Sequence, residues 1–369
     1  MADIDLHIVT FAVPYPPNYG GAIEVWNRLR ALSNAGVRIG LHCFVYGQYL
    51  AQDILKDTAK EVHYYPRSVW PVFFDKGQPF VISSRKNNLL LRRLQEDNIP
   101  VLFEGLQTTG WIEDLTNRKK FLRAHNVEHR YYHQLAQNSG GFRSLIFNRE
   151  SQCLKEYEAN HAKDFDVVFT ISTNDQQWFS AKGANSELLP PFHGFTQVDI
   201  VSGKGNYILY QGDLSIEINQ RALLEVIRMI PEGFSLPLVV AGRSGDQAFE
   251  SKIESFANIR REANVSQDKM TELIRHAQII LVHSLHAEGM KMKLFPALFQ
   301  GRFIAANRLS ASNSVLDDAI HFYEASTFVS ILQQLSAASF DEKELNTRKT
   351  ILAQMPDDAT NARQIIRYL

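Results

Sequence analysis

The sequence is poor in cysteine, has no long apolar run and carries almost no net charge. Its 369 residues include only Cys43 and Cys153, which provide neither a disulfide framework nor the paired spacing of a metal site. No stretch approaches the roughly 20 apolar residues of a membrane-spanning helix. The N-terminus lacks the basic start and unbroken apolar core of a signal peptide. These absences predict a cytoplasmic protein in a reducing compartment, and peripheral contact with the inner face of a membrane stays open.

The balance of charge argues against a protein that binds nucleic acid. Lysine and arginine total 39, aspartate and glutamate total 40, and the net charge is -1 at pH 7. Proteins that bind nucleic acid through its phosphates usually carry an excess or a long run of basic residues. No such run is present, so we expect no nucleic-acid partner.

Short apolar segments alternate with amphipathic ones along the whole chain, as in parallel βα units. The chain also exceeds the length at which one core keeps growing, which indicates two domains. The predicted strands are 6–11, 38–44, 62–65, 100–104, 120–124 and 167–171 in the first half, and 207–212, 236–242, 279–283 and 303–307 in the second. Helices are predicted at 220–230, 268–277 and 292–300.

The alternation pauses near residue 190, in a segment rich in proline, glycine and polar residues. We therefore predict an α/β protein of two doubly wound, Rossmann-like domains that face a central cleft. Ligands of such domains bind at the carboxyl ends of the strands. The predicted division is a first domain at 1–192, a linker at 193–205, a second domain at 206–350 and a C-terminal helix at 351–369 that packs back on the first domain.

The first helix is the clearest, because Ile23, Trp26, Leu29 and Leu32 recur every three residues and Gly36 follows as a C-terminal cap. It is preceded by a proline-rich turn that ends in two glycines, Gly20 and Gly21. Glycines at a helix start leave N–H groups open to an oxygen-rich ligand, although a tight turn alone could also require them.

A polar cluster follows the strand predicted at 120–124. His125 lies at the carboxyl end of that strand, where it would face the cleft, although a lone histidine is more often structural. Asn126 can cap the next helix, with Glu128 and His129 in its first turn, so the cluster also has a structural explanation.

In the second half, two lysines precede an apolar helix. Helix N-termini favour anions, so Lys291 and Lys293 predict a negative group nearby, unless both lie on a solvated face. Turns after other strands of the same sheet supply Gly212, and Gly242 with Arg243. Their joint occurrence indicates a ligand site more strongly than any one of them.

The ordered motifs resemble the GT-B glycosyltransferases, specifically their family 4-like group, over nearly the whole chain. The last motif is similar to that of a bacterial subgroup found in polysaccharide gene clusters. The motifs are "PPNYGGAIEVWNRLRALSNAGVRIGLHCF", "RAHNVEH", "YILYQGDLS", "LVVAG" and "EGMKMKLFPALFQGR".

The resemblance implies a fold, an activity and two substrates. The N-terminal domain would bind a glycan or lipid-linked acceptor, and the C-terminal domain a nucleotide sugar, with UDP or GDP as the expected nucleotide. The sugar would be transferred with retention of its anomeric configuration, without a cofactor. No Asp-x-Asp pair is placed to hold a metal, so a metal-free site is expected.

The resemblance also assigns residues. His125 would contact the transferred sugar, and Glu288 would hold its hydroxyls. Backbone and side chains at the donor phosphates would be Gly20, Gly21, Gly289 and Met290. The acceptor region or cleft would include Asn18, Tyr19, Glu104 and Asn126.

Three positions depart from the family pattern. Asp213 and Ile218 stand where the family usually has an arginine and a lysine for the phosphates, and Pro296 replaces an acidic residue that grips the ribose. We hypothesise that Lys291 and Lys293, helped by Arg243, replace the missing cations. The alternatives are a degenerate GT-B protein that acts as a binding or scaffold subunit and, less favoured, a sugar-nucleotide epimerase.

One further segment, 67–86, mixes aromatic side chains with four basic residues. A packed connection with a solvated rim is the simplest interpretation. The alternatives are a flap over the acceptor, or contact through Trp70, Phe73 and Phe74 with a membrane that carries a lipid-linked sugar.

Overall fold

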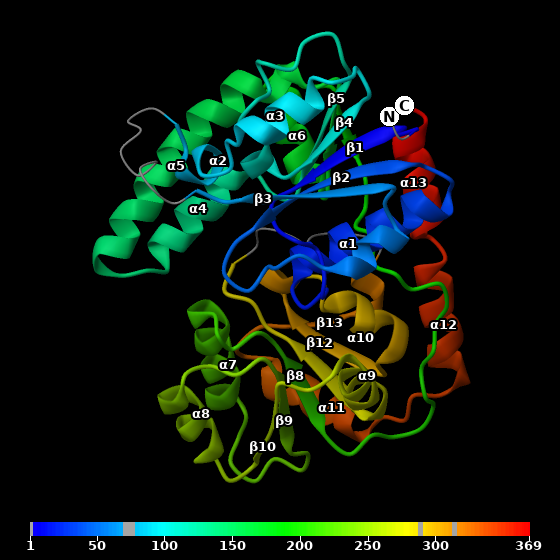
Figure 1. Cartoon of the computed structure of the whole chain (residues 1–369). Helices are drawn as coiled ribbons and strands as arrows, with labels where there is room; N and C mark the ends of the chain where they lie inside the picture. Colours follow the sequence, from blue (N-terminus) through cyan, green and yellow to red (C-terminus); the bar gives the residue numbers. More distant parts are fainter. Residues whose placement is uncertain (1–2, 69–77, 287–290, 312–315) are drawn as a thin grey trace. The chain divides into compact units, whose positions relative to one another are not determined.

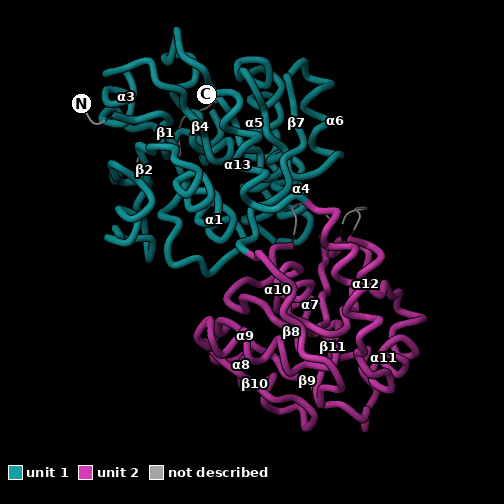
Figure 2. Tube along the Cα trace, turned by 90° about the vertical axis from the view of Figure 1, so that its right-hand side faces the viewer, with its two compact units in different colours: residues 1–194, 356–369 teal, residues 195–355 magenta. Residues whose placement is uncertain are grey.

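The computed structural model describes residues 3–68, 78–286, 291–311 and 316–369. The chain forms two compact units, Met1–Gly194 with Pro356–Leu369 and Phe195–Met355 (Figure 2). Six residues with predicted roles lie outside the described ranges: Trp70, Phe73, Phe74, Glu288, Gly289 and Met290.

The first unit contains a seven-stranded parallel sheet in the order β3-β2-β1-β4-β5-β6-β7 (Figure 1). The chain adds strands toward one edge from β1 to β3 and toward the other edge from β4 onward. The order therefore reverses between β1 and β4, the position at which doubly wound sheets bind ligands. The strands are β1 (Leu6–Thr10), β2 (Ile39–Val45), β3 (Glu61–Pro66), β4 (Val101–Glu104), β5 (Lys120–Ala124), β6 (Val167–Thr170) and β7 (Ser186–Leu188).

Helices cover both faces of this sheet, so alternate residues of a strand enter different cores. On β4, for example, Leu102 packs with the α1 and α13 side, while Phe103 packs with the α2, α3, α5 and α6 side. The helices are α1 (Gly20–Asn34), α2 (Phe80–Ser83), α3 (Asn88–Leu94), α4 (Glu128–Gln137), α5 (Gly141–His161), α6 (Thr173–Ala181) and α13 (Asp358–Ile366).

Helix α1 shows how the sequence builds its elements. Val25, Leu29 and Leu32 recur at helical spacing and are buried against the sheet. The helix ends before Gly36, whose φ of +86° is readily adopted only by glycine, which confirms the predicted cap. The buried face also includes Glu24 and Arg28, which the apolar pattern does not reveal.

The C-terminal helix α13 belongs to the first unit and packs on α1. Ala362 and Ile365 enter the same core as α1. The carboxylate of Asp358 accepts the backbone N–H groups of His193 and Gly194, each at 2.9 Å. This contact joins the start of α13 to the end of the long N-terminal segment.

The second unit contains a six-stranded parallel sheet in the order β10-β9-β8-β11-β12-β13. The order in which the chain adds strands reverses between β8 and β11. The strands are β8 (Ile208–Gln211), β9 (Leu238–Gly242), β10 (Ile259–Ala263), β11 (Ile279–Val282), β12 (Phe303–Asn307) and β13 (His321–Tyr323). The helices are α7 (Glu217–Met229), α8 (Gln247–Glu254), α9 (Gln267–His276), α10 (Leu294–Gln300), α11 (Phe328–Ala337) and α12 (Glu342–Leu352).

Much of the segment expected as a linker is bonded to the second unit. Gly203 pairs with Phe340 in an isolated antiparallel bridge, and the N–H of Asp199 donates to the carbonyl of Phe299 at 2.8 Å. The backbone of 195–205 therefore follows the second unit.

The prediction of two Rossmann-like sheets is confirmed, and every predicted strand is present within one or two residues. Three strands were missed: β7, β10 and β13. All three lie at or beside a sheet edge, and they are short or carry charges in place of an apolar run. In the described ranges, no helix is both long enough and apolar enough to cross a bilayer.

One face of the first sheet carries a row of polar side chains, which we call the histidine row. Its members run from Asp97 through His7 on β1 and His42 on β2 to Tyr65 on β3. His7 Nε2 lies 3.0 Å from Asp97, His7 Nδ1 lies 3.0 Å from His42 Nε2, and His42 Nδ1 lies 2.8 Å from the Tyr65 hydroxyl.

Charged and titratable side chains surround the histidine row. Arg118 pairs with Asp97, Arg93 donates to Tyr65, and His63 lies beside His42 near Glu61. Burial lowers the pKa of His7, although Asp97 opposes the shift, and burial holds the pKa of His42 well below 6.5.

The histidine row predicts acid-sensitive stability. Below about pH 6.5 His7 and His42 become protonated in the unfolded chain but stay neutral where they are buried in the folded protein. The free energy of unfolding should therefore fall as the pH drops from 7 to 5. The slope approaches about 1.4 kcal/mol per pH unit for each histidine. Urea unfolding at several pH values measures it. In His42→Gln the slope should be smaller by the contribution of about one proton. In His133→Gln, on the exposed face of α4, the slope should equal that of the parent. Equal slopes in all three proteins would contradict the assignment.

Candidate active site

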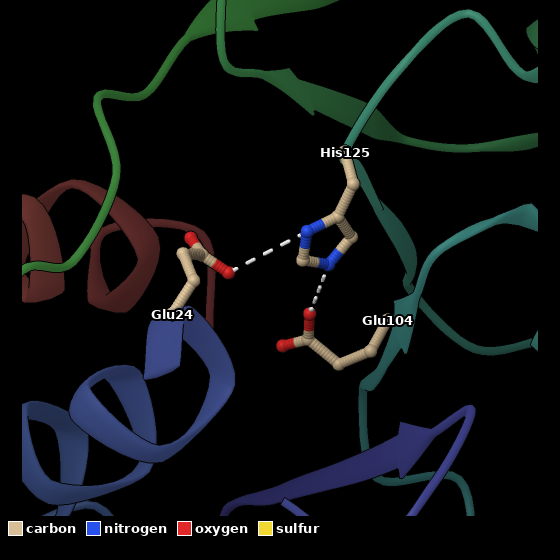
Figure 3. A group of neighbouring side chains, drawn as sticks. All are labelled: Glu24, Glu104 and His125. Carbon is tan, nitrogen blue, oxygen red and sulfur yellow. Dashed lines mark hydrogen bonds and ion pairs between the residues drawn. The ribbon is translucent and has the colours of Figure 1, made fainter. Parts of the chain in front are cut away.

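His125 follows β5 and lies between two carboxylates that come from different elements. Its Nε2 atom is 3.1 Å from Glu104, the last residue of β4, and its Nδ1 atom is 3.8 Å from Glu24 of α1 (Figure 3). The ring of Phe11, just after β1, meets the imidazole edge to face at 5.6 Å. The imidazole is thus held at the edge of the sheet where the strand order reverses.

Two buried arginines complete this cluster. Arg28 of α1 donates from Nε and Nη2 to Glu104 at 2.7 and 2.6 Å, and it also pairs with Glu24 one helical turn away. Arg123 of β5 donates to Glu24 at 2.8 and 3.1 Å and to the carbonyl of Leu189 at 2.6 Å. We call these four residues with His125 the charge cluster.

Two carboxylates and two guanidiniums face one another in the charge cluster. Burial by itself would raise the pKa of Glu24, but Arg123 and Arg28 outweigh it and bring that pKa to about 2. Glu24 is therefore an anion at neutral pH. Two carboxylates and two guanidiniums are excluded from water together, which is favourable only while each charge keeps its partners.

The cluster also offers a possible set of metal ligands. One atom each of Glu24, Glu104 and His125 lie within 4.8 Å of one another. Both carboxylates, however, already face the guanidiniums of Arg28 and Arg123, and these would repel a divalent cation. The ligand set therefore fits poorly with a resident metal ion.

Close packing gives one of the two glycines of the turn, Gly21, a structural reason. Gly20 and Gly21 are the first residues of α1. A Cβ on Gly21 would lie 3.0 Å from the ring of Phe11 and 3.2 Å from that of Tyr19, so a larger residue here would press on both rings. Asn18 is exposed just before this turn.

The start of α4 corrects one expectation. Asn126 does not cap the helix, because Val127 holds the capping position without a side-chain hydrogen bond. The carboxylate of Glu158 on α5 instead accepts the N–H groups of Glu128 and His129 at 2.7 and 3.1 Å. A cap supplied by a residue thirty positions away has no local sequence signal.

Glu128 is a titratable group that the sequence analysis did not single out as a site residue. Burial, reinforced by the nearby Glu158, raises its pKa to about 8, while Gln107 and Asn126 bond its carboxyl group. Its carboxyl group is thus largely protonated at neutral pH. It lies three positions after His125, at the same edge of the sheet.

In the second unit, Lys293 lies over the carboxyl end of β8. Its ammonium is 5.2 Å from the centre of the Tyr210 ring, and its carbonyl accepts the side-chain N–H of Gln211 at 3.1 Å. Within the described ranges, no carboxylate pairs with this half-buried ammonium. Burial lowers its pKa to about 8. The ammonium of Lys293 therefore lies where the strand order of the second sheet reverses, and no carboxylate of the described residues pairs with it.

The other predicted cations have different surroundings. The Nζ atom of Lys291 is 3.0 Å from Nδ1 of His286, and Arg243 is exposed on the loop after β9. That loop touches the loop after β8: the N–H of Leu214 donates to the carbonyl of Arg243 at 3.0 Å. Gly242 allows the approach, because a Cβ there would lie 2.2 Å from the carbonyl oxygen of Gly212.

Asp213 explains the local shape of the loop after β8. Its carboxylate accepts the N–H and the hydroxyl of Ser215 at 3.0 and 2.5 Å, so it closes a turn. The position at which the resembling sequence pattern has an arginine therefore holds a side chain that closes a turn. Lys293 is the cation that lies over this strand end.

Comparison with known proteins places these features in a fold. No family model matches the chain. An uncharacterized 44.6 kDa protein from the cps region of Klebsiella pneumoniae is 22% identical over 327 residues, which cover 83% of this chain and 84% of that protein.

Two solved structures align over almost the full chain. Sucrose-phosphate synthase from Thermosynechococcus elongatus has a TM-score of 0.72 at 12% identity and covers 98% of this chain and 97% of its own. HepE from Anabaena, solved with UDP and glucose, has a TM-score of 0.65 at 13% identity and covers 98% of both chains. The chain therefore has the GT-B fold of glycosyltransferases, as the sequence resemblance predicted.

Proposed function

We propose that this chain is a retaining glycosyltransferase that moves a sugar from a nucleotide-sugar donor to a glycan or lipid-linked acceptor. The observation that carries the proposal is Lys293, a half-buried cation without a carboxylate partner in the described ranges. It lies at the strand end where sheets of this class bind phosphates. The similarity to a protein of a cps region supports a role in bacterial surface polysaccharide synthesis.

The reaction releases a nucleoside diphosphate while positive charge develops on the sugar ring. Catalysis then depends on stabilising the departing diphosphate and on positioning the acceptor hydroxyl. Lys293 supplies positive charge to that leaving group, with Lys291 and Arg243 contributing from neighbouring loops. Gly289 and Met290 are the proposed backbone contacts to the phosphates, and Gly20 and Gly21 are proposed phosphate contacts as well.

His125 and Glu288 orient the transferred sugar in this proposal. Glu104 bonds the imidazole of His125 and Arg28 bonds Glu104, so these two residues hold the ring in place and are positioning residues. Asn18, Tyr19 and Asn126 contribute to the acceptor region. The departing phosphate takes the proton of the acceptor hydroxyl, so no separate base is required. No step uses a metal, and loss of activity in chelator would contradict this part of the mechanism.

A non-catalytic scaffold is the second candidate, and a specific observation favours it. The turn closed by Asp213 and the presence of Pro296 in α10 remove two polar contacts that the related family makes with its donor. A scaffold that no longer binds the donor would keep the fold but would have no need for Lys293 at the strand end, which counts against this candidate.

Donor binding and product formation separate these candidates. The melting temperature is measured with UDP-, GDP-, ADP- and CMP-sugars, and the products are analysed with lipid-linked and free glycan acceptors. A shift with one nucleotide class and a new glycosidic bond support the enzyme. A changed free nucleotide sugar indicates an epimerase. No shift with any donor or free diphosphate favours the scaffold.

A further inference from the structure

Two arginines converge on one tyrosine ring at the carboxyl edge of the first sheet. Arg67 follows β3, Tyr46 follows β2, and Arg85 follows α2. The guanidinium carbons of Arg67 and Arg85 lie 4.9 and 5.5 Å from the centre of the Tyr46 ring. Arg85 is 7% exposed, whereas Arg67 is half-buried and accessible.

The hydrogen bonds that these two guanidiniums donate go to neutral acceptors, and Glu150 interacts with Arg67 only through space. Arg85 donates to the carbonyls of Phe11 and Val81 at 3.0 and 2.8 Å, and Arg67 donates from Nε to the hydroxyl of Ser84 at 3.1 Å. Across 3–68, 78–286, 291–311 and 316–369, neither guanidinium forms an ion pair with a carboxylate. Burial, together with the neighbouring charge of Arg67, lowers the pKa of Arg85. Two like charges in a partly dry site are unfavourable unless an anion joins them.

This arginine pair lies next to the charge cluster. Arg85 bonds the carbonyl of Phe11, and the ring of Phe11 contacts the imidazole of His125. One residue therefore separates the pair from the proposed sugar-binding histidine. Half-buried aromatic rings extend from Tyr46 to Tyr49 and on to Tyr19, with centre-to-centre distances of 5.1 and 5.7 Å. Aromatic surface beside a few charged donors is typical of a small-molecule site.

We propose that Arg67 and Arg85, beside Tyr46, form a subsite for an anionic group of the acceptor. The group is an oxyanion, either the carboxylate of an acidic sugar or the phosphate of a lipid carrier. Guanidinium forks bind both through paired N–H donors. This inference rests on the proposed function, because it assumes that the first unit receives an acceptor. It also gives two of the four basic residues in 67–86 a role that does not require membrane contact.

Two pairs of probes, each matched except for its anionic group, test the subsite by calorimetry on the full chain. The first pair is 4-nitrophenyl glucuronide and 4-nitrophenyl glucoside, and the second is farnesyl phosphate and farnesol. In at least one pair we expect the charged member to bind about tenfold more tightly. The pair that shows the preference identifies the source of the oxyanion.

Arg67→Gln should abolish the preference, and Arg67→Lys should retain part of it. Arg92→Gln, which removes an exposed arginine from α3, should leave it intact. Equal or undetectable binding of both members in both pairs would overturn the inference, and so would a preference that survives in Arg67→Gln. UDP and GDP binding is measured on the same preparations. If the parent binds UDP or GDP but shows no charge preference, only the inferred subsite is contradicted. If the parent binds neither nucleotide, the proposed function is contradicted.

Discussion

Replacing Lys293 by methionine should weaken binding of the donor nucleotide by roughly 10- to 100-fold. A hydrogen bond to a charged group contributes about 1.5 to 3 kcal/mol, and each 1.4 kcal/mol changes the dissociation constant tenfold. Methionine keeps the apolar stem over Tyr210 but removes the ammonium. Because that ammonium is half-buried without an acidic partner in the described ranges, the free energy of unfolding should not fall. Calorimetric titration with the free diphosphate and urea unfolding measure the two effects.

The pH dependence of binding distinguishes a phosphate ligand from a structural lysine. With a pKa of about 8, Lys293 is charged below that pH and becomes neutral above it. Donor affinity should therefore be constant near pH 7 and fall by up to about tenfold per pH unit above pH 8, because binding must then restore the proton. The profile should be flat in Lys293→Met and unchanged in Lys252→Met, an exposed lysine of α8. Full affinity in Lys293→Met would disprove the role in phosphate binding.

Replacing Arg28 by methionine should destabilise the protein by about 3 to 5 kcal/mol, because a buried carboxylate loses its partner. Arg28 is 1% exposed and bonds both Glu24 and Glu104. Without it, two anions share Arg123 and His125. Urea unfolding at pH 7 measures the loss.

The acid side of the same experiment has a defined sign. Glu24 has a pKa of about 2 in the folded protein, so its stabilising contribution is complete above the ordinary carboxyl range and is lost as the pH falls toward 2. The difference between parent and Arg28→Met should therefore shrink in acid.

Two further variants control for simple loss of packing. The double variant Arg28→Met with Glu104→Gln should recover part of the stability, because the unpaired carboxylate is gone. Arg92→Met, on the exposed surface of α3, should change the free energy of unfolding by no more than about 0.5 kcal/mol. If Arg28→Met proved as stable as the parent, the charge cluster would not be held together by ion pairs.

The candidate sites were predictable to different degrees. His125, Lys291, Lys293 and Arg243 stand at predicted strand ends or helix starts, so local pattern and resemblance were enough to propose them. Sequence reasoning could not reveal that Lys293 lies over the Tyr210 ring while Lys291 faces His286. Side chains two residues apart can point differently, and burial depends on distant segments.

The sequence by itself determined the alternation of strands and helices and the presence of two parallel sheets. These follow from apolar periodicity, which a short window of residues contains. The tertiary structure alone decided which polar residues became a cluster. Arg28 meets Glu104 across 76 positions, and Arg123 meets Glu24 across 99. Such pairs form only when strand order and register bring separate segments together, because an ion pair depends on distance in space and leaves no periodic signal along the chain.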